Sequence, residues 1–153
     1  MQDQIKSKTL AVDLGARRVG LALGDERGSL ATPLEVLEVT SPENAIEQVM
    51  LAAKREGADL LVIGVPINMD DSFGESARQA VKWGRELSRR SNLNAVFVDE
   101  RLSSFAADQH LADESRQGRK LTRKGKKRRQ DALAAADFLQ AYLDGRLKPL
   151  RFD

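Results

Sequence analysis

Asp13 is an acidic residue inside an apolar run, Thr9–Leu14, that is typical of a buried strand. An isolated charge in a medium of low dielectric constant is costly, so such a carboxylate must be paired, protonated or bound to a metal. One explanation is an ion pair with Arg17 or Arg18 in the turn that follows. The alternative, which we favour, is metal or phosphate chemistry at the end of this strand.

Three further acids stand at the ends of expected elements. Asp99 and Glu100 close a strand expected at 95–98, and Asp131 begins a helix expected at 131–143. In open α/β sheets, ligands bind at the carboxyl ends of the strands. Carboxylates suit hard cations such as Mg²⁺ or Mn²⁺. Two such ions about 4 Å apart can activate water and stabilise the leaving oxygen of a phosphodiester. We therefore expect a metal-dependent site.

The segment 116–129 is strongly basic and holds no acid. The other 16 basic residues face 23 acidic ones, so the rest of the chain carries −7 while the whole carries +2. Such a patch favours a polyanionic partner, because Lys and Arg displace counterions from phosphates. Since the segment directly precedes Asp131, we interpret it as a nucleic-acid contact rather than a solvated loop. Its basic residues are Arg116, Arg119, Lys120, Arg123, Lys124, Lys126, Lys127, Arg128 and Arg129.

Three arginines next to the expected carboxylates are further candidates for phosphate contact, namely Arg17, Arg18 and Arg101. For the two arginines in the turn after the first strand, a structural ion pair with Asp25 or Glu26 is an equally good interpretation.

Length and composition favour one domain over residues 1–153. The chain has no cysteine, which excludes disulfides and thiolate metal sites. No stretch resembles a signal peptide or approaches the roughly 18 apolar residues of a membrane span. We expect a cytoplasmic protein with no membrane partner.

The apolar pattern predicts an α/β fold. Three apolar runs, at 9–14, 19–24 and about 30–39, are joined by short turns as in an antiparallel meander. Ser41 and Pro42 are typical of a helix start. Strands are then expected at 59–65 and 95–98, with helices at about 74–90, 103–114 and 131–143. This order predicts a mixed sheet flanked by helices, antiparallel in its first half and parallel in its second.

Four motifs span nearly the whole chain: AVDLGARRVGLA at 11–22, GVPINMD at 64–70, DERLSS at 99–104 and DALAAA at 131–136. In type and order they resemble the motifs of the YqgF family, also called the pre-16S rRNA nuclease or Holliday-junction-resolvase-like family. The chain departs from the usual pattern with Val65 in place of Leu, Asp71 in place of Gly and Ser104 in place of Thr. Glycine at position 71 would permit a positive φ that Asp adopts less readily.

The resemblance implies an RNase H-like fold with five strands in the order 3-2-1-4-5. It also implies a cytoplasmic, metal-dependent nuclease that matures the 5′ end of small-subunit ribosomal RNA. By motif position, Asp13, Glu100 and Asp131 are implied to be the catalytic metal ligands. The implied partners are precursor ribosomal RNA or branched DNA, and ribosomal precursor particles.

The implied strand order raises a geometric problem for Glu100. The fifth strand lies two positions from the first, which places their ends roughly 10 Å apart at about 4.8 Å per strand. Glu100 must therefore bend back over the fourth strand to meet Asp13. Two alternatives follow: Asp70 replaces it as ligand, or Asp99 faces the site while Glu100 pairs with Arg101.

Three functions remain open on the sequence. The leading one is an RNA endonuclease, and a Holliday-junction-type DNA resolvase would use the same residues. A non-catalytic module that binds RNA or a ribosome precursor would share them without productive geometry. A hairpin with Asp-x-Gly also opens the nucleotide-binding domains of actin-like ATPases, but this chain is too short to supply their second lobe.

Overall fold

A five-stranded mixed sheet forms the centre of the protein. The computed structural model describes residues 8–25, 27–101 and 123–152, with the backbone alone for 123–131. The strand order is β3-β2-β1-β4-β5, antiparallel from β1 to β3 and parallel from β1 through β4 to β5, as predicted. The strands are β1 (Thr9–Leu14), β2 (Arg18–Gly24), β3 (Ala31–Glu38), β4 (Leu60–Val65) and β5 (Asn94–Asp99).

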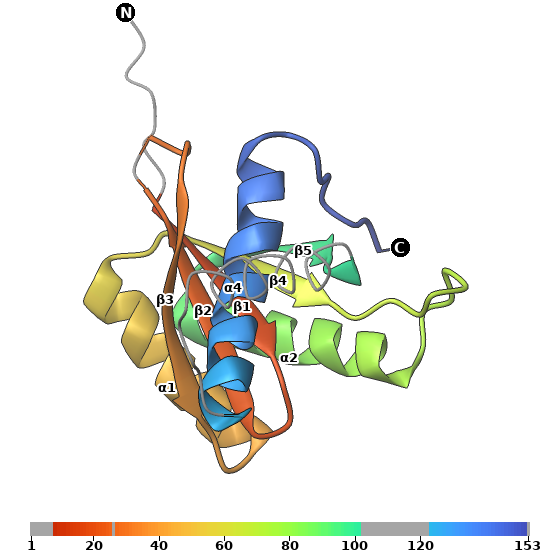
Figure 1. The fold of residues 1–153 in the computed structure, drawn as a ribbon, viewed down its shortest axis with the longest axis horizontal. Coiled ribbons are helices and arrows are strands. Elements are labelled where there is room, and N and C mark those ends of the chain that lie inside the picture. The colour runs from red at the N-terminus through yellow and green to blue at the C-terminus, as the bar shows by residue number, and fades with distance from the viewer. Residues whose placement is uncertain (1–7, 26, 102–122, 153) are drawn as a thin grey trace, which may run out of the picture.

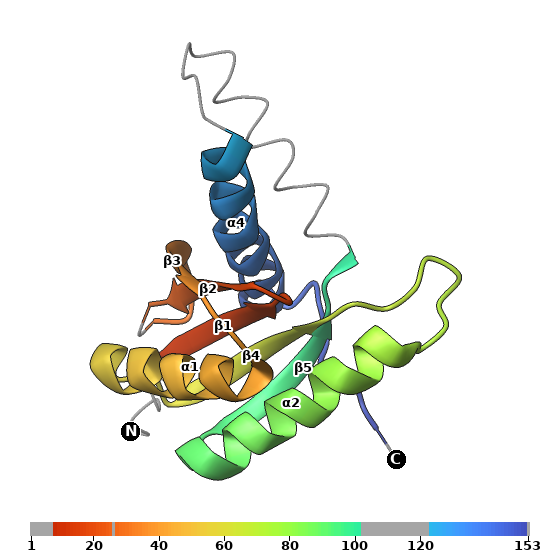
Figure 2. The same cartoon turned by 90° about the horizontal axis from the view of Figure 1, so that it is seen from below.

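Helices cover both faces of this sheet. In Figures 1 and 2, α1 and α2 lie along one face, and α4 rises from the other. Because side chains alternate along a strand, Val12 and Ile63 pack under α1 and α2, while Ala11 and Val62 pack under α4 with Phe138. The helices are α1 (Pro42–Glu56), α2 (Glu75–Ser91) and α4 (Arg123–Leu143).

The start of α1 has the local chemistry that the sequence predicts. Ser41 is its N-cap, and Pro42 lies in the first turn. The hydroxyl of Ser41 accepts a hydrogen bond from the backbone N–H of Asn44, with 3.0 Å between Oγ and N. The indole N–H of Trp83 on α2 donates to the carbonyl of Pro42 at 3.0 Å. This bond fixes the first turn of α1 against α2.

The predicted start of the last helix is wrong. The helix α4 already includes Arg123, so Asp131 lies within it and does not occupy the favourable first turn. Arginine and lysine are good helix formers without any apolar periodicity, which explains why a pattern of apolar residues missed these turns. The basic residues of 123–129 therefore belong to the same helix as Asp131. The helix expected at 103–114 lies outside the described residues.

The segment after α4 returns to the edge strand β5. The backbone N–H of Leu150 donates to the carbonyl of Phe97 at 2.7 Å. The ring of Phe152 packs against Phe97 and Phe73, with centroids 5.6 and 5.5 Å apart. The end of the chain thus covers part of the open edge of the sheet.

Within the part of the chain that the structure describes, no helix is long and apolar enough to cross a bilayer.

Candidate active site

Asp13 and Glu100 come together at the carboxyl ends of the parallel strands. Asp13 lies near the end of β1, and Glu100 directly follows β5, with β4 between the two strands. Their carboxyl groups share a hydrogen bond. Glu100 therefore does bend back across β4, as the resemblance requires.

Gly64 on β4 makes this approach possible. A Cβ atom at position 64 would lie 2.6 Å from Oε2 of Glu100 and 2.7 Å from Cε2 of Phe138, so any larger residue would displace one of them. Neither Gly64 nor Phe138 was predicted as a residue of the site. A glycine within a buried apolar strand was the available signal, because it often marks a close approach.

The electrostatics of the pair favour a bound cation. Burial, then the charge and hydrogen bond of Asp13, and then the charge of Asp99 raise the pKa of Glu100 to about 9. Without a cation the pair therefore holds a proton near neutral pH. A divalent cation would relieve the same repulsion and compensate for the burial.

The donor set also fits such a cation. Mg²⁺ is commonly held by one or two carboxylates together with water and substrate phosphates. Asp13 and Glu100 supply two carboxylates. No cluster of three acids or histidines that could hold a metal occurs among the side chains that the structure describes. Those side chains do not include that of Asp131, whose backbone lies in α4 seven residues before Phe138.

The pairing of Glu100 with Arg101, on which the alternative with Asp99 depended, is wrong, because Asp99 pairs with Arg101 and Glu100 bonds to Asp13. The carboxylate of Asp99 pairs with Arg101 at 2.6 Å and also accepts from the backbone N–H of Arg101. The guanidinium of Arg101 reaches further, to the carbonyl of Asn68 at 3.0 Å and to the carboxylate of Asp71. Arg101 thus joins the end of β5 to the loop that follows β4, and its role as a phosphate contact stays a prediction.

The loop between β4 and α2 holds its own acids away from this pair. The carboxylate of Asp70 accepts hydrogen bonds from the hydroxyl and the backbone N–H of Ser72. These two bonds lower the pKa of Asp70. This arrangement does not support Asp70 as the substitute ligand. Asp71 has φ of 68°, so it does adopt the left-handed conformation that glycine would adopt more readily, and its carboxylate pairs with Arg101.

Two hollows adjoin the turn between β1 and β2, and one of them includes Glu100. One, of about 500 Å³, is lined by Gly15, Pro42, Pro66 and Glu100 among others. Another, of about 860 Å³, is lined by Arg17 and Arg18 with residues that follow β3.

Arg17 lies in the turn between β1 and β2, and Arg18 is the first residue of β2, where it pairs in register with Glu38 of β3. Arg17 is exposed and Arg18 half-buried. Asp25 lies at the far end of β2, where its carboxylate accepts from Ser29, so it is not positioned as their ion-pair partner.

Six of the basic residues predicted to hold nucleic acid lie in the backbone of α4. Within the described backbone, the first two turns of this helix carry Arg123, Lys124, Lys126, Lys127, Arg128 and Arg129. They share a helix with Asp131 and with Phe138, which packs beside Glu100. Arg116, Arg119 and Lys120 lie outside the described residues.

Comparison with known proteins points to one family. A family profile described as "RuvX: Holliday junction resolvase" matches residues 7–145. A protein of Anaeromyxobacter sp. (strain Fw109-5), named "Putative pre-16S rRNA nuclease", is 38% identical over 137 residues, which cover 90% of this chain and 96% of the relative. A protein of the same name from Staphylococcus carnosus (strain TM300) is 36% identical over 140 residues, covering 90% and 95%.

A solved structure supports the fold independently. Thermus thermophilus RuvC in complex with a Holliday junction superposes with a TM-score of 0.57 at 16% identity, covering 94% of this chain and 99% of that protein. At this identity the likeness establishes the fold, and it confirms the predicted RNase H-like architecture. The profile and the two relatives show that the chain belongs to the RuvX family, also called the YqgF family, as its four motifs predicted.

Proposed function

We propose that this protein is a metal-dependent endonuclease that hydrolyses phosphodiester bonds during maturation of the 5′ end of 16S ribosomal RNA. The observation that carries the proposal is the Asp13–Glu100 pair, which is half-buried, shares a hydrogen bond and lies at the edge of the sheet where α/β folds bind ligands. The names of the relatives support the class of substrate.

Each residue has a distinct role in this proposal. Asp13, Glu100 and Asp131 hold Mg²⁺ or Mn²⁺, and Gly64 leaves the space in which Glu100 reaches Asp13. The bound cation supplies activation of water and stabilisation of the leaving oxygen. Arg17 and Arg18 steady the phosphates beside Asp13. The basic residues of 123–129 bind phosphates of the nucleic acid that lie further from the cleaved bond.

The setting of the reaction is part of the same proposal. Residues 1–153 act as one catalytic domain in the cytoplasm, where precursor ribosomal particles supply the RNA. The concentration of positive charge in one segment of an otherwise acidic chain supports a polyanionic substrate.

A second candidate is cleavage of branched DNA, which the description of the family profile favours. Purified protein should be incubated with precursor 16S RNA and with a four-way DNA junction, each with Mg²⁺, Mn²⁺ or EDTA. We expect metal-dependent cleavage of the RNA near the mature 5′ end. Cleavage of the junction alone would assign the protein to the resolvases. Metal-independent binding of RNA without cleavage of either substrate would identify a non-catalytic module.

A further inference from the structure

A groove on the outer side of α2 combines positive charge with exposed aromatic rings. It has a volume of about 760 Å³, and we call it the α2 groove. Its lining includes the rings of Phe73 and Phe152, the basic residues Arg78, Lys82, Arg85 and Arg89, and two acids, Glu43 and Glu86, which both pair with Arg90. It lies on the face of the sheet opposite α4. It therefore shares no residue with the acidic pair or with the basic segment that precedes Asp131.

The basic residues of the groove follow one stripe of the helix. Arg78, Lys82, Arg85 and Arg89 are spaced by four, three and four residues, which places them on one side of α2 over about 16 Å at 1.5 Å per residue. Arg78 and Arg89 pair with glutamates of the same helix. Neither Lys82 nor Arg85 has a carboxylate partner among the described residues. Two cations are thus left to meet an anionic ligand.

The aromatic residues give the groove a second kind of surface. Phe73 remains 37% exposed although it packs against Phe152. The guanidinium carbon of Arg85 lies 5.7 Å from the centre of the Phe152 ring. Partly exposed rings beside cations are what proteins offer to unpaired bases, which stack on the rings while the phosphates meet the charges. A duplex would keep its bases away from such a surface.

The groove is fixed relative to the acidic pair. Phe73 lies near the end of the loop that follows β4. Its carbonyl accepts a hydrogen bond of 3.1 Å from the guanidinium of Arg78. The same loop is bound at Asn68 by Arg101, which pairs with Asp99 at the end of β5. Glu100 is the next residue after Asp99. The aromatic end of the groove is therefore connected through a short series of hydrogen bonds to the strand end that carries Glu100.

We propose that the α2 groove binds single-stranded RNA that flanks the cleaved phosphate, with an unpaired base stacked on Phe73 and phosphates on Lys82 and Arg85. The proposal rests on the proposed function for the identity of the strand. It adds that the substrate is unpaired on this side of the cut, and that the protein holds it on both faces of the sheet.

The test measures binding of a fluorescent oligouridylate to the full-length protein in EDTA at several salt concentrations. The double variant Lys82→Gln/Arg85→Gln should bind more weakly, and the slope of log affinity against log salt should fall by about 1.4, or about 0.7 for each phosphate of a single strand that is no longer neutralised. The control is Arg27→Gln/Lys54→Gln, which removes one exposed arginine and one exposed lysine outside the groove. A control that weakens binding equally, or a groove variant with the parent affinity and slope, would overturn the proposal.

A second variant separates stacking from charge. Phe73→Leu keeps an apolar side chain but removes the ring, so its affinity for oligouridylate should fall by at least about fivefold. Its affinity for polyglutamate, an anion without bases, should not change. Equal losses for both polymers would contradict stacking and would assign the groove to acidic protein segments.

Because EDTA prevents cleavage, this result is independent of the catalytic proposal. If the parent protein cleaves no RNA but the groove variants still lose affinity, the nuclease proposal fails and the groove stands. If cleavage of precursor RNA is observed while the groove variants bind as the parent does, the groove proposal alone fails.

Discussion

At the scale of single residues, the meeting of Asp13 and Glu100 makes the metal-free protein less stable than it could be. Burial and the charge of Asp13 raise the pKa of Glu100 to about 9, so at neutral pH the folded protein must keep a proton that the unfolded chain would release, which costs free energy. Asp13→Asn should raise the melting temperature of the protein in EDTA. It should also reduce metal-dependent cleavage by more than about a hundredfold, since even partners of metal ligands cost about 10- to 100-fold when mutated.

Thermal melts and cleavage assays on the same preparation check this prediction. Glu100→Gln should lose activity in the same way, whereas Asp99→Asn and Asp70→Asn should retain most of it. An Asp13→Asn variant that cleaves at the parent rate, or that does not fold, would refute the metal-ligand role.

Gly64 provides a second prediction at this scale. Gly64→Ala should destabilise the protein by about 1–3 kcal/mol, because the new methyl group would crowd Glu100 and Phe138. It should also lower the activity of the folded fraction by displacing the carboxylate. Gly84→Ala is the matched control, since its methyl group would lie 2.5 Å from Phe97 on the opposite face of the sheet. Equal activity per folded molecule in the two variants would contradict this role of Gly64.

The acids of the site were predictable from the sequence. Which of Asp99 and Glu100 lies on the α4 side of the sheet was not. Asp13 was identified because a charge stands out within an apolar strand. Both faces of β5 carry apolar residues, Phe97 on one side and Val98 on the other, so the apolar pattern could not tell which acid faces α4. Contacts across the sheet decide that question, and single-sequence patterns do not contain them.

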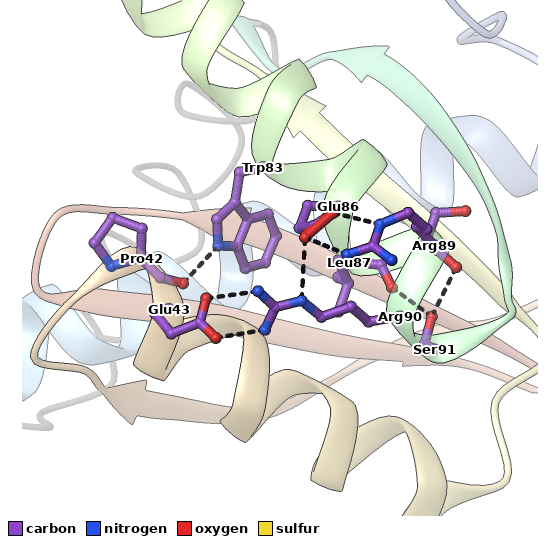
Figure 3. Close-up of polar contacts among 9 residues, drawn as sticks. Pro42, Glu43, Trp83, Glu86, Leu87, Arg89, Arg90 and Ser91 are labelled. Atoms are coloured by element: carbon purple, nitrogen blue, oxygen red, sulfur yellow. Dashed lines mark hydrogen bonds and ion pairs between the residues drawn. The ribbon is translucent and has the colours of Figure 1, made fainter.

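At the scale of elements, Arg90 connects α1 to α2. Its guanidinium contacts both carboxylate oxygens of Glu43 on α1, one of them at 2.8 Å, and Glu86 on its own helix at 3.2 Å (Figure 3). Arg90 lowers the pKa of Glu43, while Arg89 and then Arg90 lower that of Glu86 from 4.5 to about 2. The folded protein therefore favours the ionised forms of both glutamates.

A pH-dependent loss of stability follows for Arg90→Gln. A carboxyl group with a lowered pKa stabilises the fold above its ordinary value near 4.5, and this contribution is lost as the pH falls toward about 2. The variant should therefore melt below the parent at pH 7, and the two melting curves should converge as the pH approaches 2. Arg89→Gln, which removes a pair within α2 only, should have a smaller effect. A difference that grows on acidification would contradict this account.

The elements themselves were largely predictable, and the exception has a physical reason. Alternation, caps and glycines correctly indicated the strand pattern and the start of α1. The start of α4 was missed because its first turns carry Arg and Lys, which favour a helix by intrinsic propensity without leaving an apolar period. Charge is the only pattern in these turns, and charge alone does not distinguish a helix from a loop.

At the scale of the whole molecule, positive charge is concentrated before Asp131 while the rest of the chain is acidic. Replacing Lys126, Lys127, Arg128 and Arg129 by Gln should weaken nucleic-acid binding and flatten its dependence on salt, by somewhat under one unit of slope for each phosphate that the variant no longer neutralises. Cleavage at saturating substrate should fall less than affinity. Titration of the variant against the parent at several salt concentrations checks this. If the affinity and the salt slope of the variant equal those of the parent, the basic segment is a solvated surface and not a nucleic-acid contact.

The position of β4 between the two acid-bearing strands also bears on the order of folding. The meander β1-β2-β3 has short turns, whereas β1, β4 and β5 pair across whole helices. Pairings between distant parts of a chain form more slowly, because a larger loop must close. Asp13 and Glu100 therefore meet only when these slow pairings are complete. A newly made or partly unfolded chain holds no acidic pair, so the metal site that we propose can form only as the last strands join the sheet.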